Sequence, residues 1–310
     1  PHMAGFARSG YIGKGLKLLL DVRRKVKVIG NVTALRAEGD GQVSSIVYRQ
    51  GNGAEQRLPA ETLLLHQGVI PGINLANAAG CAQHFDTVQH CWTPTVDEWF
   101  ASSIPGIAIA GDGAGIGGAE SAALRGEVAA LDAARRLGRL SEAERDAQAA
   151  PIRAELARSQ RGRRFLDLLY RPAPQFLAPL ADETIVCRCE EVTAGQIRDT
   201  ARRLGVTGPN QMKAFLRCGM GPCQGRRCRE QIQALLALQE DLALGAVPLA
   251  GYRSPVRPMT LAEATAPEDP AIAEVWDSWF GMPRQWVPFW DVEPQYTVAA
   301  LATEKEHVSE

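Results

Sequence analysis

Five of the seven cysteines in this chain lie close together, between Cys187 and Cys228. The segment reads CRCEEVTAGQIRDTARRLGVTGPNQMKAFLRCGMGPCQGRRC. Four thiolates can ligate either a zinc ion or an iron–sulfur cluster, because both accept that ligand set. Zinc knuckles usually place two residues between paired cysteines. Neither the pair Cys187 and Cys189 nor the pair Cys223 and Cys228 has that spacing. We therefore favour an iron–sulfur cluster; a structural zinc site and unligated buried thiols are the alternatives.

Helix signals in the same segment indicate where these thiols lie. Only one residue separates Cys187 from Cys189, so the two cannot share a helix face, and we place both in a loop. A helix over residues 193–205 is predicted from a capping box at its start and a glycine at its end. A second helix is predicted over residues 209–218, where glycines and a proline interrupt the chain.

The second pair of cysteines needs a different placement. Cys223 and Cys228 are five positions apart, which on one helix would separate them by about 140°. We expect Cys223 in the glycine-rich loop and Cys228 just inside the next helix, so that two loops converge beside helix N-termini that favour an anionic cluster. Glycines in the second loop free backbone N–H groups to donate to sulfur. Arg226, Arg227 and Arg229 form either a solvated surface or charges that offset the cluster or bind a partner.

The stretches VCRCEEVTAGQI and GPNQMKAFLRCGMGPCQGRRC resemble the bacterioferritin-associated-ferredoxin-like (BFD-like) 2Fe-2S domain of FAD-dependent oxidoreductases. More narrowly, they resemble the alpha subunits of the opine oxidase, hydrogen cyanide synthase and D-hydroxyproline or proline dehydrogenase group. The resemblance implies a CxC…CxxxxC ligand pattern, which maps onto Cys187, Cys189, Cys223 and Cys228. Cys218 is then the extra thiol, and it is the substitute if one of those four assignments is wrong.

A second motif, SSIPGIAIAGDGAGIGGAESAALRG, resembles the C-terminal FAD motif of the glutathione-reductase-like superfamily. The pattern predicts an apolar strand over residues 107–110, a glycine-rich turn and an Ala-rich helix that ends at residue 138. We expect the aspartate at the strand end to accept hydrogen bonds from ribityl hydroxyls, and the helix N-terminus to face the pyrophosphate or the flavin. The candidate cofactor-binding residues are Gly111, Asp112, Gly113, Gly117 and Gly118.

Upstream of this motif, residues 26–71 alternate β-branched and polar residues, with turn signals at residues 40–41 and 51–53 that predict strands joined by hairpins. A short helix is expected over residues 16–24. LLLHQGVIP, residues 63–71, resembles the strand that closes the second dinucleotide domain of the superfamily. The βαβ unit with GxGxxG that begins the family is not found, because the glycines at positions 10, 13 and 15 have neither its spacing nor a preceding strand. We expect the chain to match the C-terminal part of the family over residues 1 to about 265.

The expected fold is α/β, a partial glutathione-reductase-like FAD/NAD(P)-binding domain followed by a small all-α BFD-like 2Fe-2S domain. The predicted boundaries are an oxidoreductase portion over residues 1–145, a helical linker over 146–180, the 2Fe-2S domain over 181–246 and a Pro- and Trp-rich tail over 247–310. A helix over residues 231–244 should bury Ile232, Leu235, Leu236 and Leu242. The tail's tryptophans form either a docking surface or a strap on their own chain.

Composition excludes several classes of function. A net charge of −1 offers no electrostatic basis for binding nucleic acid, and no apolar run reaches the ~18 residues of a transmembrane helix. An odd, clustered set of cysteines is typical of a reducing cytoplasm rather than of a secreted disulfide framework. The pattern around Cys81 and Cys91 has two nearby histidines but no ligand-like spacing, and it favours ordinary buried thiols over zinc.

Together, the residues and the resemblance predict a flavin- and iron–sulfur-containing electron-transfer subunit of an amine or amino-acid dehydrogenase. The resemblance implies FAD and a 2Fe-2S cluster as cofactors, a D-amino-acid-oxidase-like beta subunit that oxidises an opine, glycine, proline or hydroxyproline, and a respiratory or quinone acceptor. No general base or nucleophile is identified, so no catalytic residue is assigned. We expect a cytoplasmic protein, peripheral to the inner membrane through its complex. The alternative is a non-catalytic 2Fe-2S redox sensor or adaptor with a vestigial flavin domain.

Overall fold

The computed structural model describes residues 6, 11–66, 68–171, 173, 177, 179–252, 256 and 259–265, and divides into two units, Pro1–Pro258 and Met259–Glu310. In the second unit it describes one short helix, α10 (Leu261–Ala264), which a Thr260–Glu263 capping box begins. The predicted roles of the tail's tryptophans lie outside the described residues. No helix among the described residues has the length and apolar character needed to span a membrane.

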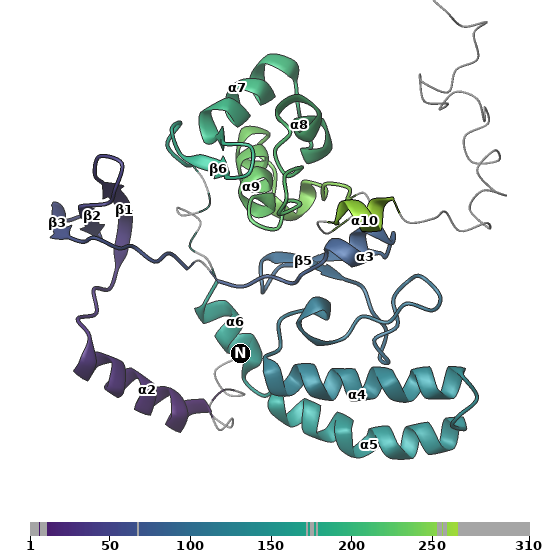
Figure 1. The fold of residues 1–310 in the computed structure, drawn as a ribbon. Helices are drawn as coiled ribbons and strands as arrows, with labels where there is room; N and C mark the ends of the chain where they lie inside the picture. The colour runs from purple at the N-terminus through teal and green to yellow at the C-terminus, as the bar shows by residue number, and fades with distance from the viewer. Residues whose placement is uncertain are drawn as a thin grey trace, which may run out of the picture. The chain divides into compact units, whose positions relative to one another are not determined.

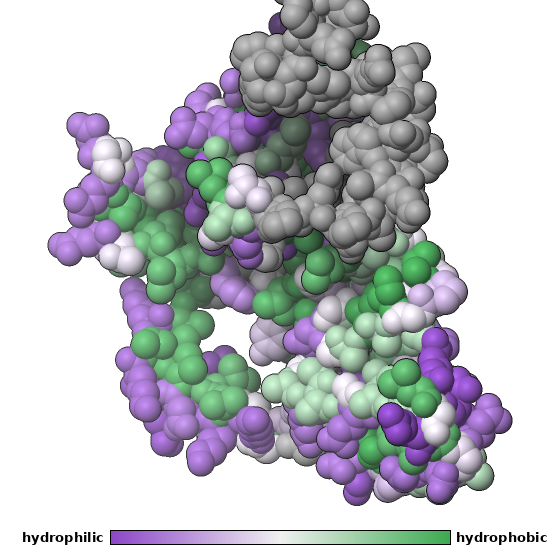
Figure 2. All heavy atoms as spheres, turned by 45° about the vertical axis from the view of Figure 1, so that its right-hand side comes forward, coloured by the Kyte–Doolittle hydropathy of each residue, from purple (hydrophilic) through white to green (hydrophobic). Residues whose placement is uncertain are grey.

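The N-terminal part contains helix α2 (Tyr11–Lys25) and a three-stranded antiparallel sheet (Figure 1). Strands β1 (Val32–Glu38), β2 (Ser45–Gln50) and β3 (Glu55–Pro59) pair in the order β1-β2-β3. The predicted helix and hairpins are confirmed. Leu16, Leu18, Leu19 and Leu20 are all exposed, and Figure 2 shows hydrophobic residues at the surface in this part of the molecule.

Two predicted strands are wrong. The described residues of 63–71 lie outside any strand, and the chain runs on into helix α3 (Asn74–Ala78) and the hairpin of β4 (Gln83–Asp86) with β5 (Cys91–Pro94). Residues 107–110 pair only through an isolated bridge between Ala101 and Ala108. An apolar run becomes a strand only where a neighbouring strand pairs along it, and here a tight turn ends the pairing after one residue.

The glycine-rich turn and the helix after it form as predicted. The turn folds as a short 3-10 helix, η1 (Gly111–Ala114), and leads into α4 (Ala119–Arg136). Gly138 follows α4 with φ of +67° and ends it close to the predicted position. Helix α5 (Glu142–Ser159) then packs antiparallel to α4, and α6 (Arg163–Leu169) follows (Figure 1). The predicted boundary at residue 145 therefore falls inside α5.

A buried carboxylate joins α4 to α5. Asp132 on α4 is 3% exposed and accepts hydrogen bonds from Arg135, Arg136 and Arg145, at 3.0, 2.6 and 3.0 Å. The Arg145 guanidinium also stacks on the Trp99 ring, 3.8 Å from its centroid. Burial acts to raise the pKa of Asp132, but the three arginine hydrogen bonds outweigh it and hold this pKa below its usual value.

The cysteine-rich region of the first unit builds a hydrophobic core of its own. A hairpin of β6 (Ile185–Cys187) with β7 (Val192–Thr193) precedes α7 (Ala194–Leu204), α8 (Pro209–Leu216) and α9 (Arg229–Gln239), and the 3-10 turn η3 (Leu244–Ala246) follows. Thr193 and Gln196 form the predicted capping box, and Gly205 ends α7 in the left-handed region. The core includes Ile197, Met212, Leu235 and Leu236.

Two expectations for this domain need correction. It is not purely helical, because the β6–β7 hairpin carries the first cysteines. The last helix ends at Gln239 rather than near residue 244, so that Leu242 is 47% exposed and lies outside the buried face that holds Ile232, Leu235 and Leu236. The apolar spacing continued past the point where the core beneath the helix ended.

The ion pairs at Asp132 generate a prediction about stability. Replacing Asp132 with Ala leaves the buried Arg145 guanidinium without that carboxylate, which should lower the free energy of unfolding by about 3 kcal/mol. In the parent chain this contribution is present above pH ~4 and is lost as the pH falls through the lowered pKa of Asp132. Urea unfolding at pH 7 and below pH 4 measures both effects.

The matched control is Asp199→Ala, which breaks the exposed pair of Asp199 with Arg203 on α7. This change should alter the free energy of unfolding by less than about 1 kcal/mol, because solvent screens exposed pairs. Equal losses in the two variants would contradict a special role for the buried carboxylate.

Candidate metal centre

The five clustered thiols lie on two segments between helices, the β6–β7 hairpin before α7 and the loop from α8 to α9. Cys187 ends β6 and is buried, while Cys189 lies in the β6–β7 turn and is exposed. Cys218 follows α8 and is fully buried, Cys223 is half-buried in the glycine-rich loop, and buried Cys228 forms the N-cap of α9. The predicted loop placement is therefore correct for Cys189 and Cys223, whereas Cys187 is the last residue of a strand.

The structure brings the four predicted ligands together in two touching pairs. The Cys189 thiol donates a hydrogen bond to Cys223, and the Cys228 thiol donates one to Cys187. Each pair joins one cysteine of the first loop to one of the second, so the two loops converge as expected. Across the described ranges, no three histidine, cysteine, aspartate or glutamate side chains cluster as a site for one metal ion.

Backbone amides surround one of these sulfurs. The Cys223 sulfur accepts hydrogen bonds from the N–H groups of Gly225, Arg226 and Arg227, and the Arg226 N–H also donates to the Cys223 carbonyl at 3.1 Å. Burial acts to raise the pKa of this thiol, but these donors and the Cys189 thiol outweigh it, and the pKa lies below its usual value. The same N–H donors would stabilise the charge of a thiolate-bound cluster. The four thiols and this cradle therefore fit a 2Fe-2S cluster.

Cys218 differs from the four predicted ligands in its surroundings. Burial raises its pKa to about 12, and the nearby Cys187 acts in the same direction. A small cavity of about 20 Å³ is lined by Cys218 and Cys228 among others, so the fifth thiol lies next to the predicted ligands without belonging to either hydrogen-bonded pair. The assignment of the four ligands stays a prediction.

The glycine-rich turn of the upstream half is organised around Asp112. One carboxylate oxygen, Oδ1, accepts hydrogen bonds from the backbone N–H groups of Gly117 and Gly118, at 2.9 and 3.2 Å. The Arg125 side chain donates to the carbonyl of Gly111 at 3.2 Å and also to that of Gly115. Asp112 thus directs one oxygen at the start of α4, where the sequence motif predicts a pyrophosphate or flavin. Flavin binding by this turn stays a prediction.

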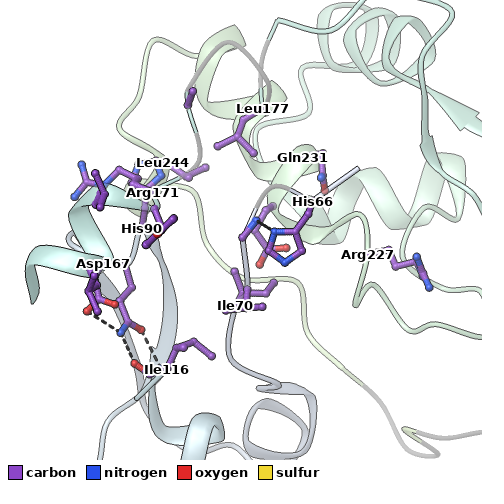
Figure 3. Close-up of a pocket in the computed structure, with 18 of the residues that line it drawn as sticks. His66, Ile70, His90, Ile116, Asp167, Arg171, Leu177, Arg227, Gln231 and Leu244 are labelled. Atoms are coloured by element: carbon purple, nitrogen blue, oxygen red, sulfur yellow. Dashed lines mark hydrogen bonds between the residues drawn. The ribbon is translucent and has the colours of Figure 1, made fainter. Parts of the chain in front are cut away.

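A cavity of about 760 Å³ lies beside this turn and is lined by both halves of the first unit (Figure 3). The Gln89 side chain connects two parts of the wall. Its amide nitrogen donates to the carbonyl of Ile116 at 2.7 Å and to Asp167 on α6 at 3.2 Å, and its amide oxygen accepts from the Ile116 N–H at 3.0 Å. The cysteine-rich domain contributes residues of the last loop and α9. The lining arginines are Arg163, Arg171, Arg226 and Arg227.

Several residues of this cavity were missed by sequence reasoning. His66 and His90 both line it, although neither was assigned a role. Burial, followed by the charge of Arg171, lowers the pKa of His90. Cys81 and Cys91 are both buried, and Cys81 lies 3.5 Å from the Ser102 hydroxyl. The wall is built from residues far apart in the chain, so no local spacing indicates it.

Direct hydrogen bonds connect the cysteine-rich domain to the upstream half. The Asn74 side chain on α3 donates to the carbonyl of Gln224, the residue after Cys223, at 2.8 Å. The backbone N–H of Tyr252 donates to the side chain of Asn77, also on α3, at 3.2 Å. Both ends of this connection lie within the first unit, and they hold the glycine-rich cysteine loop against α3.

Comparisons with known proteins agree with this architecture. Residues 185–237 match the BFD-like [2Fe-2S] binding domain. The A subunit of opine oxidase from Rhizobium meliloti is 44% identical over 262 residues, which are 84% of this chain and 49% of that protein. The corresponding protein of Agrobacterium tumefaciens (strain Ach5) is 44% identical over 263 residues, covering 84% and 52%. The chain therefore spans about half the length of these curated relatives.

More distant similarity extends the comparison. Hydrogen cyanide synthase subunit HcnB of Pseudomonas aeruginosa is 30% identical over 201 residues, covering 63% of this chain and 43% of that protein. The crystal structure of L-proline dehydrogenase from P. horikoshii matches with a TM-score of 0.59 and 21% identity, over 80% of this chain and 47% of that chain, which shows a shared fold. Over the part that these matches span, the chain is similar to the oxidoreductase subunits HcnB and opine oxidase A, and its residues 185–237 match the BFD-like [2Fe-2S] binding domain.

Proposed function

We propose that this chain is the electron-transfer, alpha-type subunit of an amine or amino-acid dehydrogenase that contains flavin and a 2Fe-2S cluster. The observation that carries the proposal is the convergence of four thiols from two loops inside a domain that matches a 2Fe-2S family. A flavin accepts electrons in pairs and a 2Fe-2S cluster carries them singly, so the two cofactors together convert a two-electron oxidation into one-electron steps.

The residues of this chain would hold the cluster and leave one edge of it accessible. Cys187 and Cys228 are buried and would anchor it on the core of the cysteine-rich region, whereas Cys189 is exposed. Electron transfer needs one such accessible edge. The three backbone N–H groups near Cys223 would stabilise the charge on its sulfur. Because they belong to the backbone, no side chain would have to move to supply these donors.

The large cavity supports the flavin part of the proposal. Its volume of about 760 Å³ falls within the range of sites that bind small molecules and cofactors. The arginines in its wall suit a phosphate-bearing ligand, because guanidinium groups bind phosphate through paired hydrogen bonds. Its walls include Ile116 from the glycine-rich turn and Arg226 and Arg227 from the cysteine loop, so a flavin held there would border both segments.

Substrate, partner and location belong to the proposal as well. The relatives are named as subunits of opine oxidase and hydrogen cyanide synthase, which indicates assembly with other subunits. We assign oxidation of the carbon–nitrogen bond of an opine, glycine, proline or hydroxyproline to a D-amino-acid-oxidase-like beta subunit. We assign release of the electrons to a respiratory or quinone acceptor, reached by a cytoplasmic complex peripheral to the inner membrane.

Absorbance of anaerobically purified protein tests the cofactor content. We expect flavin bands together with iron–sulfur bands, and close to two irons per chain by metal analysis, because the cluster holds two. Iron–sulfur bands without flavin would favour the alternative function, a 2Fe-2S sensor or adaptor with a vestigial flavin domain. A colourless protein that contains one zinc ion would contradict both functions.

Replacement of single cysteines tests the ligand set. Cys223→Ser should abolish the cluster absorption, because it removes a predicted ligand that lies in contact with Cys189. Cys218→Ser is the matched control, since Cys218 lies next to the ligands but outside both hydrogen-bonded pairs. We expect it to retain most of the iron. Loss of iron in Cys218→Ser with full iron in Cys223→Ser would show that the two roles are exchanged.

A further inference from the structure

We propose that Arg229, a buried guanidinium held next to Cys228 by Tyr252, raises the reduction potential of the 2Fe-2S cluster. Arg229 is thus a positioning residue for electron transfer: it contacts no predicted ligand sulfur itself, and it acts through the electrostatic potential at the cluster. The inference rests on the proposed function, because it requires the cluster to be present.

The position of Arg229 differs from that of the other arginines beside the cysteines. It is the first residue of α9, directly after the N-cap Cys228, and it is 4% exposed. Its Nε donates to Glu230 at 2.7 Å, and its Nη1 lies 3.5 Å from the Tyr252 hydroxyl. Arg226 and Arg227, in the same loop, are exposed. A charge removed from water acts more strongly on its neighbours than an exposed one.

Tyr252 places this charge against the cysteine loop. A Cβ built on Gly225 would lie 3.4 Å from the Tyr252 hydroxyl oxygen, so the phenol rests directly on the backbone of that loop. The cavity of about 20 Å³ between them is lined by Cys218, Cys228, Arg229 and Tyr252 among others. Arg229, Tyr252 and one predicted ligand, Cys228, therefore line the same small cavity.

The segment that carries Tyr252, residues 247–252, is fastened at several points. The Gln233 side chain on α9 donates to the carbonyls of Val247 and Pro248, at 3.1 and 3.0 Å. The Gly251 N–H donates to the Asn210 side chain at 2.8 Å, and its carbonyl accepts from Lys213 at 2.6 Å. This segment lies beyond residue 237, where the match to the 2Fe-2S domain ends, and its Val247 belongs to the same buried core.

The sign of the effect follows from charge. Reduction adds one negative charge to the cluster, and a nearby buried positive charge stabilises the reduced form more than the oxidised form. Arg229 should therefore raise the potential. Glu230, whose side chain is 15% exposed, pairs with Arg229 and opposes part of this effect.

The experiment is an EPR-monitored redox titration of the cluster in the full chain, with Arg229→Met, Arg229→Lys and Glu230→Gln variants. Arg229→Met should lower the reduction equilibrium constant at least tenfold, a drop of about 59 mV for one electron. Arg229→Lys keeps the charge and should restore most of the potential, and Glu230→Gln should shift it upward. Arg227→Met is the control, and its exposed charge should produce a smaller shift than that of Arg229→Met.

The outcomes separate the two levels of the proposal. A parent chain without a cluster signal would overturn the proposed function itself. A normal cluster whose potential is the same in the parent, Arg229→Met and Glu230→Gln would overturn the role of Arg229 alone. Equal drops in Arg229→Lys and Arg229→Met would show that Arg229 acts by packing rather than by charge. If Arg229→Met does not retain its cluster, the potential of Arg229→Gln, which also removes the charge, decides the question.

Discussion

The close approach of two backbone loops is the constraint on which the cysteine-rich domain depends. Gly221 lies so near the β6–β7 turn that a Cβ on it would overlap the Cβ of Cys189. Gly219 and Gly225, on either side, adopt positive φ values of +85° and +72°, which side chains other than glycine rarely tolerate. Only a loop of this composition lets four thiols from two segments meet, and the core beneath, with Ile197 and Leu236 fully buried, holds both segments in place.

The contacts between the two halves of the first unit extend this constraint. On α3, Asn74 binds the loop after Cys223 and Asn77 binds the backbone of Tyr252, so one helix holds both the cysteine loop and the segment packed on it. The same loop forms one wall of the large cavity beside the glycine-rich turn. An electron relay requires its centres to be held at a fixed separation, and hydrogen bonds between the halves are a physical means of doing so.

The upstream half uses its charged groups mainly to build its own structure. Asp112 binds the N–H groups that begin α4, and Arg125 fills the space above Gly117 while binding two carbonyls of the same turn. Asp132 and Arg145 join α4 to α5 in a similar way. Asp112, which the motif associates with a cofactor, therefore also stabilises the turn that carries it. The sequence motif alone does not show this structural role.

The sequence by itself determined the local elements of this protein. The capping box at Thr193, the glycine that ends α7 and the hairpin turns of the three-stranded sheet act over a few residues, and each is found where it is predicted. It also indicated that the two cysteine loops converge. Local patterns failed where pairing partners decide the outcome, as for the predicted strand at residues 107–110. Only the tertiary structure decided the pairing of Cys187 with Cys228, the cavity wall around Gln89 and the placement of Tyr252 on Arg229. These contacts join residues from 23 to 78 positions apart, as at Arg229–Tyr252 and Gln89–Asp167, and packing rather than spacing brings them together.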